Sequence, residues 1–285
     1  MPTMDGHAHV FKALSEHYPR AVHPMYPPHL EAPVEELLST MQTHRVEKAI
    51  LVALSPHDEY LGECLSSHPN RLAGIGVLDP SRSSDAEGVH RRFSESGLRG
   101  LRVHHLGAQG STRAQELDAW PALQALSELE GIVWLYVPAE ELELLPMALD
   151  HLPGLRVVIN HLGWPLPNEF KIDTLGRPTI KGTIPATTLK TVLVLSHYAN
   201  VHVMFSGQYA FSREDYPFAD LGRVVWTIYK EYGAGRMIWA SDYPWTKEVP
   251  GYGPQLQLVD HFLPNLSPEE RAAIMGNSAA RLFGL

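Results

Sequence analysis

The chain of 285 residues has almost no cysteine, because Cys64 is the only one. A single cysteine excludes an internal disulfide, so the fold does not depend on an oxidising compartment. No apolar run approaches the roughly 18 residues of a membrane-spanning helix. The first residues also lack the basic region and apolar stretch of a secretory signal. These absences predict a cytoplasmic protein that does not enter a membrane.

Positive charge is scarce as well. Lys and Arg total 23 against 32 Asp and Glu, which gives a formal net charge of −9. Proteins that bind nucleic acid or anionic membrane surfaces present a basic face, so neither partner is expected. A small-molecule substrate fits this composition better.

Eight short apolar runs recur along the chain, at residues 4–10, 49–54, 73–78, 100–104, 132–137, 157–161, 201–205 and 237–241. Most are continuously apolar, which is typical of parallel strands covered on both faces. Helical periodicity separates them, for example from Val34 to Met41 and from Leu221 to Tyr232, and Ser267 with Glu270 forms a capping box at the start of the last helix. The alternation predicts one α/β domain over residues 1–285, a (β/α)8 TIM barrel with long top loops.

Two stretches interrupt the regular spacing. The chain from His161 to Val201 is rich in proline and glycine, and the chain from His17 to Pro33 is rich in proline, histidine and tyrosine. Both follow the carboxyl end of a predicted strand, where long loops of a barrel act as lids or specificity elements. We expect both stretches to wall the barrel mouth, although a solvated excursion without a role remains the alternative for the longer one.

Histidines stand at the ends of two predicted strands. His7 and His9 lie two residues apart on the first strand, so their side chains project to the same side and form a chelating pair. His161 ends the sixth strand. Asp242 follows the last strand, where a carboxylate needs a partner; capping the next turn is the structural alternative. In a barrel these strand ends converge on one cavity.

The motifs Asp5-Gly6-His7-Ala8-His9, Asn160-His161-Leu162-Gly163 and Ser241-Asp242-Tyr243-Pro244, followed by Asn277-Ser278-Ala279-Ala280-Arg281, stand in this order from the first strand to the last helix. In this order the chain resembles the amidohydrolase-related family, which includes 2-pyrone-4,6-dicarboxylate lactonase, sugar lactonases and relatives of aminocarboxymuconate semialdehyde decarboxylase. The motifs are fairly specific to this branch of the superfamily but not to a substrate.

The resemblance implies a metal site and two catalytic residues. His7, His9 and Asp242, with His161 as a further candidate, would hold one divalent ion, most often zinc. Asp242 would act as general base, and His161 would lie within reach of the water or substrate. Such barrel enzymes are often homodimers, and the sequence leaves that state open.

One departure keeps the metal in question. Many metal-binding relatives carry a histidine at the end of the fifth strand, whereas this strand continues into Tyr136. The chain resembles the pyrone-dicarboxylate lactonase branch here, where a tyrosine occupies this place and catalysis is thought to proceed without metal. Three protein ligands and a water still satisfy zinc, so metal-dependent and metal-independent catalysis both remain open.

Further candidates for substrate binding follow the other strands. Arg102 on the fourth strand could anchor a carboxylate through its bidentate fork, or pair with an acid of the barrel. The remaining candidates are His104, Tyr136, Ser206, Tyr209 and Arg213, with Arg213 as a second carboxylate ligand or a surface ion pair. Aromatic residues of the top loops favour a flat or partly apolar substrate, namely Trp164, Tyr209, Phe211, Tyr243 and Trp245.

The leading functional hypothesis is hydrolysis of a carbonyl compound, most plausibly a lactone or cyclic ester that carries a carboxylate. Asp242 would activate water, and a metal or the histidines would polarise the carbonyl. Metal-dependent non-oxidative decarboxylation of an unsaturated or aromatic acid is the alternative. A catalytically silent barrel that binds a small molecule is a third hypothesis.

Overall fold

A computed structural model describes residues 3–79 and 86–285. Within these residues, eight strands form one parallel sheet in the order β1-β2-β3-β4-β5-β6-β9-β10. The strands are β1 (Thr3–Ala8), β2 (Val46–Val52), β3 (Leu72–Val77), β4 (Gly100–Val103), β5 (Ile132–Leu135), β6 (Arg156–Ile159), β9 (Val201–Phe205) and β10 (Met237–Trp239). Each lies at one of the eight apolar runs, so the predicted set of strands is confirmed.

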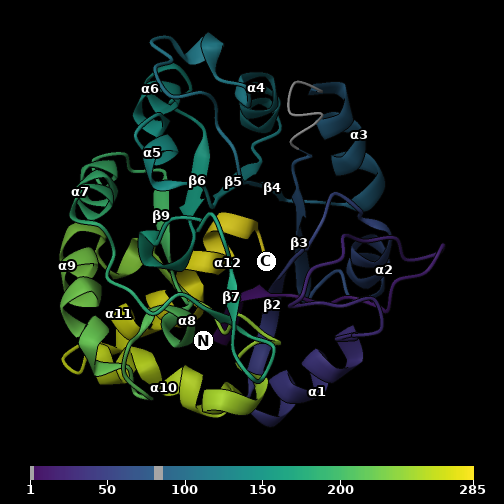
Figure 1. Cartoon of the computed structure of the whole chain (residues 1–285), viewed down its shortest axis with the longest axis vertical. Coiled ribbons are helices and arrows are strands. Elements are labelled where there is room, and N and C mark those ends of the chain that lie inside the picture. The colour runs from purple at the N-terminus through teal and green to yellow at the C-terminus, as the bar shows by residue number, and fades with distance from the viewer. Residues whose placement is uncertain (1–2, 80–85) are drawn as a thin grey trace.

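Helices surround the strands (Figure 1). The outer ring consists of α1 (Val34–Thr43), α2 (Glu59–Ser67), α3 (Ala86–Ser96), α4 (Trp120–Glu128), α5 (Ala139–Leu142), α6 (Leu145–His151), α7 (Ala186–Leu195), α9 (Gly222–Tyr232) and α10 (Tyr252–Phe262). The helical patterns at Val34–Met41 and Leu221–Tyr232 correspond to α1 and α9. Strand and helix therefore alternate as predicted, and the (β/α)8 barrel is confirmed.

The last segment of the chain contains α11 (Pro268–Ala272) and α12 (Ser278–Phe283). The predicted capping box is present, because the amide of Glu270 donates to Ser267 Oγ at 3.2 Å and the amide of Ser267 donates to Glu270 Oε2 at 2.8 Å. Both unpaired amides are thereby satisfied at the start of α11.

The barrel closes between β1 and the residues that follow β10. The amide of Asp242 donates to the carbonyl of His7 at 2.9 Å, and the amide of His9 donates to the carbonyl of Tyr243 at 2.7 Å. The backbone bonds of this seam therefore hold the candidate residues of the first and last strands beside one another.

Large apolar side chains fill the barrel interior. Ile50, Ile75 and Trp134 are fully buried there, and α12 packs against the same cluster, with the rings of Trp134 and Phe283 6.4 Å apart. In Figure 1 this C-terminal helix crosses the middle of the ring. The packed interior is a core, and the site is left to the carboxyl ends of the strands.

Both irregular stretches lie where they were expected. The segment after β6 begins with a 3₁₀ turn at His161–Gly163 and continues into a small antiparallel pair, β7 (Lys171–Ile172) and β8 (Pro178–Thr179). Helix α7 then occupies residues 186–195, so the loop is shorter than the full span to Val201 that the sequence indicated.

In the described part of the chain, no helix is long and apolar enough to cross a membrane.

Candidate active site

The four central candidates lie together at the carboxyl ends of the strands. His7 and His9 come from the end of β1, His161 follows β6 and Asp242 follows β10, and all four are buried. A cavity of about 300 Å³ opens above them, and His9, His161 and Asp242 line it. The convergence predicted from the strand ends is therefore present.

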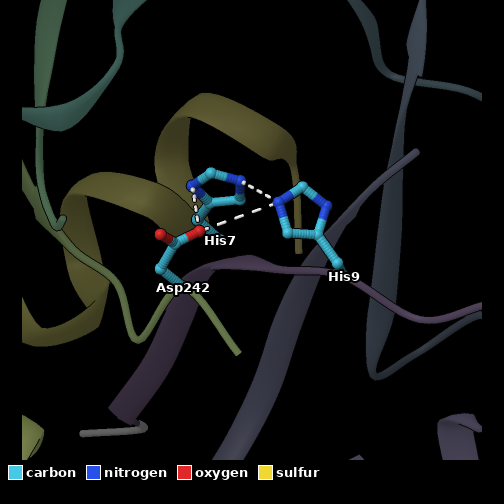
Figure 2. Close-up of side chains that lie close together, drawn as sticks. All are labelled: His7, His9 and Asp242. Carbon is cyan, nitrogen blue, oxygen red and sulfur yellow. Dashed lines mark hydrogen bonds and ion pairs between the residues drawn. The ribbon is translucent and has the colours of Figure 1, made fainter. Parts of the chain in front are cut away.

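The two histidines of β1 and Asp242 form a compact group (Figure 2). The Nε2 atoms of His7 and His9 are 3.0 Å apart. Asp242 Oδ1 lies 3.6 Å from His7 Nδ1 and 3.7 Å from His9 Nε2. All three side chains offer a ligand atom within 4.8 Å of the others.

This group fits a divalent metal ion. His9 Nδ1 donates to the carbonyl of Val52 at 2.7 Å, which leaves the lone pair of Nε2 directed at His7. Burial, the largest cause, and the nearby Arg102 charge lower the pKa of His9 to about 3. Burial likewise lowers the pKa of His7, which keeps both imidazoles in the neutral form that binds metal. Two imidazoles and one carboxylate make a three-ligand set with room for water.

His161 is held from one side by the next strand. Its Nδ1 atom is hydrogen-bonded to Ser206 Oγ at 2.9 Å, and its Nε2 atom lies 4.0 Å from Asp242 Oδ2. A Cβ atom on Gly207 would come within 2.7 Å of His161 Nδ1, so only glycine allows this close approach. Ser206 and Gly207 together orient the imidazole toward Asp242.

The backbone is unusual at both catalytic candidates. His161 and Asp242 have positive φ angles of 46° and 60°. A non-glycine residue in this region costs free energy, and such residues cluster at functional sites. The conformation is maintained at Asp242 by the seam hydrogen bond to His7.

The two carboxylate oxygens of Asp242 face different groups. Its Oδ1 atom faces His7 and His9, whereas its Oδ2 atom accepts a hydrogen bond of 2.8 Å from the Tyr209 hydroxyl. Burial raises the pKa of Asp242 to about 7, while the Tyr209 hydrogen bond and the Arg102 charge oppose that rise. A carboxyl group with a pKa near neutrality is suited to general acid–base catalysis.

Arg102 reaches the same cavity from β4. The side chain is buried, and no ion pair to it is found among the described residues, although the charge of Asp242 acts on it from a longer distance. Its Nε atom has no hydrogen-bond partner, and its guanidinium lies 5.0 Å above the Tyr136 ring. A buried cation without an ion-pair partner is costly, so this group is available to an anionic ligand.

His104 and Tyr136 also line the cavity. Burial first, and the Arg102 charge second, lower the pKa of His104 to about 3, so the imidazole is neutral near pH 7. Burial raises the pKa of Tyr136, which remains a hydrogen-bond donor. Both side chains are therefore placed to contact a ligand.

Three other candidates have different positions. Tyr209 lines the cavity and also bonds to Asp242. Ser206 lies behind His161 and does not line the cavity, and Arg213 is exposed outside it, with its backbone amide bonded to Asp220. Arg213 lies beyond the short helix α8 (Gln208–Phe211), and Ser212 and Asp220 bind the turn that carries it away from the mouth.

Four of the five aromatic candidates lie at or beside the mouth. Tyr209, Phe211 and Trp245 line the cavity, and Trp164 stacks on Phe211 with ring centroids 4.9 Å apart. Tyr243 is fully buried and donates to Glu36 instead, so it supports the seam and not the cavity wall.

Sequence reasoning gave no role to Asp5, which is buried beneath the site. Its carboxylate accepts hydrogen bonds from the amide of His7, from the amide and hydroxyl of Ser241, and from the hydroxyl of Tyr252. A carboxylate within the apolar first strand was the signal that it had partners across the barrel. Asp5 thus joins the strand of the two histidines to the residue that precedes Asp242.

Comparisons with known proteins agree with this architecture. A family model described as Amidohydrolase matches residues 4–285. An L-fucono-1,5-lactonase from Burkholderia ambifaria is 25% identical over 251 residues, which cover 84% of this chain and 80% of the relative.

Two solved structures share the fold. One, from Pseudomonas putida and assigned as a 2-pyrone-4,6-dicarboxylic acid hydrolase, has a TM-score of 0.75 at 24% identity and covers 99% of this chain and 97% of its own. Another, an amidohydrolase from Burkholderia multivorans with bound zinc, has a TM-score of 0.74 at 20% identity and full coverage of both chains, 100% each.

Proposed function

Because the chain belongs to the amidohydrolase family, we propose that it hydrolyses a lactone or related cyclic ester that carries a carboxylate. One observation carries the proposal: the unpaired guanidinium of Arg102 and the carboxylate of Asp242 line the same cavity. An anionic substrate held at Arg102 would present its carbonyl to the group of His7, His9, His161 and Asp242. The similarity to a lactonase supports a lactone as the substrate and its ester bond as the bond that is cleaved.

We assign His7, His9 and Asp242 Oδ1 as the residues that would hold one divalent ion, with zinc as the proposed metal. The bound ion would supply Lewis-acid polarisation of the carbonyl and lower the pKa of water. Without an ion, His7 and His9 would act as direct substrate ligands, with the lone pair of His9 Nε2 accepting a hydrogen bond, and the roles of the other residues would be the same.

The protein's own groups account for binding and proton transfer. Arg102 binds and orients the substrate carboxylate. Asp242 Oδ2 takes a proton from the attacking water and returns it to the ring oxygen as the ester C–O bond breaks. The products are a carboxylic acid and an alcohol, so the atoms of one water are added.

Tyr209 and His161 position the base. The Tyr209 hydroxyl donates to Asp242 Oδ2 and fixes the carboxylate, and His161 directs Nε2 toward the same oxygen because Ser206 holds its other nitrogen.

Elemental analysis of the purified protein, combined with a lactonase assay, tests the proposal. About one divalent ion per chain is expected, with both ion and activity lost in the double variant His7→Ala/His9→Ala. An active protein without metal would assign the reaction to the metal-independent route. Absence of hydrolysis across carboxylate-bearing lactones, in metal-loaded and metal-free protein alike, would contradict the proposed function.

The same sample separates the alternative hypotheses. Release of CO2 from an unsaturated or aromatic acid, without lactone hydrolysis, would favour decarboxylation. The structure offers no specific observation for that reaction, and Tyr136 stands where the decarboxylases carry a histidine. Ligand binding with no turnover of either kind would favour the silent barrel.

A further inference from the structure

The cavity has a polar floor. The polar lining residues that come from the strand ends or directly follow them are His9, Arg102, His104, Tyr136, His161 and Asp242, and Tyr26 of the loop after β1 and Tyr209 of α8 add two more hydroxyls. Apart from Arg102, the described lining contains no arginine or lysine. Among the described side chains of the lining, Arg102 is therefore the only one with a permanent positive charge, and it lies at one place on the floor, apart from the group of His7, His9 and Asp242.

The outer part of the cavity is mostly apolar. Met25 comes from the loop after β1, and Leu166, Phe170, Pro178 and Ile180 come from the segment after β6. This wall is held in place by a backbone hydrogen bond. The amide of Ile180 donates to the carbonyl of Ala210 at 2.7 Å, which connects the end of β8 to helix α8. We call these five residues the roof.

A second arginine beside the cavity, Arg177, is already paired. Arg177 lies with its guanidinium 5.7 Å from the Tyr209 ring, but it pairs with Asp173 at 2.7 Å and donates to the carbonyl of Val249. It lines the neighbouring cavity and not this one. A second substrate carboxylate would therefore enter without a free cation to receive it.

Side chains that bind hydroxyls are absent from the five roof residues. The tyrosine hydroxyls and imidazoles of the described lining lie outside the roof, Asp242 is its only carboxylate, and no serine, threonine, asparagine, glutamine or glutamate is among these residues. Sugar hydroxyls need acceptors as well as donors, and a hydroxyl buried under an apolar roof without a partner costs free energy. A polyhydroxylated ring is therefore poorly matched to the roof.

We propose that the site takes a substrate with a single carboxylate and an apolar body, with the carboxylate on Arg102 and the body beneath the roof. This inference rests on the proposed function and narrows it: the substrate is an alkyl- or aryl-substituted monocarboxylic lactone, rather than a sugar lactone or a lactone dicarboxylate. The floor then recognises charge and carbonyl, and the two long loops recognise the apolar part.

Binding measured by isothermal titration calorimetry tests this without turnover. The probes are 3-phenylpropionate, its uncharged amide, phenylsuccinate, which adds one carboxylate, and gluconate, which replaces the ring with hydroxyls. We expect 3-phenylpropionate to bind at least about tenfold more tightly than each of the others. Equal or tighter binding of phenylsuccinate or gluconate, or no measurable binding of 3-phenylpropionate, would overturn the inference.

Two variants assign the effect to floor and roof. Arg102→Met should reduce the affinity for 3-phenylpropionate to that for the amide, since the charge contact is lost. Ile180→Asn should reduce the ratio of the affinity for 3-phenylpropionate to the affinity for gluconate, since it places a polar group in the roof. A ratio that is unchanged in Ile180→Asn would contradict the assignment of the roof.

The two proposals fail separately. If the probes bind in the expected order but no lactone is hydrolysed, the ligand class stands and the reaction is wrong. If lactones are hydrolysed but a sugar lactone or a dicarboxylate has the highest kcat/KM, the reaction stands and the ligand class is wrong.

Discussion

At the scale of single residues, the proposed function gives Asp242 two roles, one for each carboxylate oxygen. Oδ1 belongs to the group with His7 and His9, and Oδ2 faces Tyr209 and His161. A residue with both roles needs a fixed side chain, which the positive-φ backbone and the seam hydrogen bond provide.

The substitution Asp242→Asn keeps the shape of this residue and removes the base. We expect kcat to fall by about 10²- to 10⁴-fold, the range for loss of general base catalysis, with the melting temperature retained. Steady-state assays and thermal unfolding by circular dichroism measure the two effects. Full activity in this variant would exclude Asp242 as the base.

The matched control is Tyr209→Phe, which leaves the base and removes its hydrogen-bond donor. Its loss of kcat should be smaller, about tenfold, which corresponds to one hydrogen bond. A loss as large as that of Asp242→Asn would indicate that the tyrosine hydroxyl itself takes part in the reaction.

At the scale of elements, the seam between β1 and β10 depends on Asp5. Its carboxylate accepts four hydrogen bonds from β1, the residue before Asp242 and α10. An asparagine would place its NH2 group against the hydroxyls of Ser241 and Tyr252, which now donate to the carboxylate. We therefore expect Asp5→Asn to lower the free energy of unfolding by about 2 kcal/mol. Activity should fall as well, although Asp5 does not line the cavity.

Tyr252→Phe is the graded comparison for the seam, because it removes one of the four bonds to Asp5. We expect a loss of about 1 kcal/mol in chemical denaturation. Equal stability of Asp5→Asn and the unmodified protein would show that the seam is held without this carboxylate.

The loop after β1 is held by one arginine. The guanidinium of Arg20 donates to carbonyl oxygens around the loop, namely those of Lys12, Ala21, Tyr26, Pro27, Pro28 and Leu30. This loop brings Met25 and Tyr26 to the cavity. One planar side chain thus fixes a wall that contains little regular structure.

For Arg20→Ala we expect faster proteolytic cleavage within residues 13–31 and a higher KM, with a smaller change in kcat. The barrel does not depend on this loop, so global unfolding should change little. Arg20→Lys is the matched control, since it keeps the charge but cannot span the carbonyls. Cleavage at the unmodified rate in Arg20→Ala would show that the loop is held by other contacts.

At the scale of the whole molecule, a half-buried histidine, His202, links stability to pH. His202 lies on β9, two residues before the interior Met204, and burial, the largest cause, lowers its pKa to about 4, with Arg236, Arg281 and Arg156 adding to the shift. The unfolded chain takes up its proton near pH 6.5, well before the folded chain does. The free energy of unfolding should therefore fall as pH decreases from about 6.5 toward 4.

Replacing this histidine by a group that does not titrate, His202→Gln, should reduce that slope by at most about 1.4 kcal/mol per pH unit. Urea denaturation at several pH values measures it. An identical slope in both proteins would mean that other groups, such as the buried His104, carry the pH dependence.

Much of the barrel follows from local pattern. Apolar runs such as residues 72–77 and 132–135 must be covered on both faces, and the helical spacing in α1 and α9 requires a buried side against them. The sequence also predicted that the two histidines of β1 lie close to the aspartate after β10, because parallel strands of a barrel place their carboxyl ends at one rim. For these residues the sequence alone determined the site.

Only the tertiary structure decided which neighbours each polar group has. It placed Arg102 without a counter-ion, directed Ser206 to the back of His161, carried Arg213 out to the surface and gave Asp5 its partners across the barrel. These outcomes depend on contacts between residues as far apart as Asp5 and Ser241, and on the path of long loops. No local pattern encodes such contacts, because they form only when the closed barrel brings distant strand ends together.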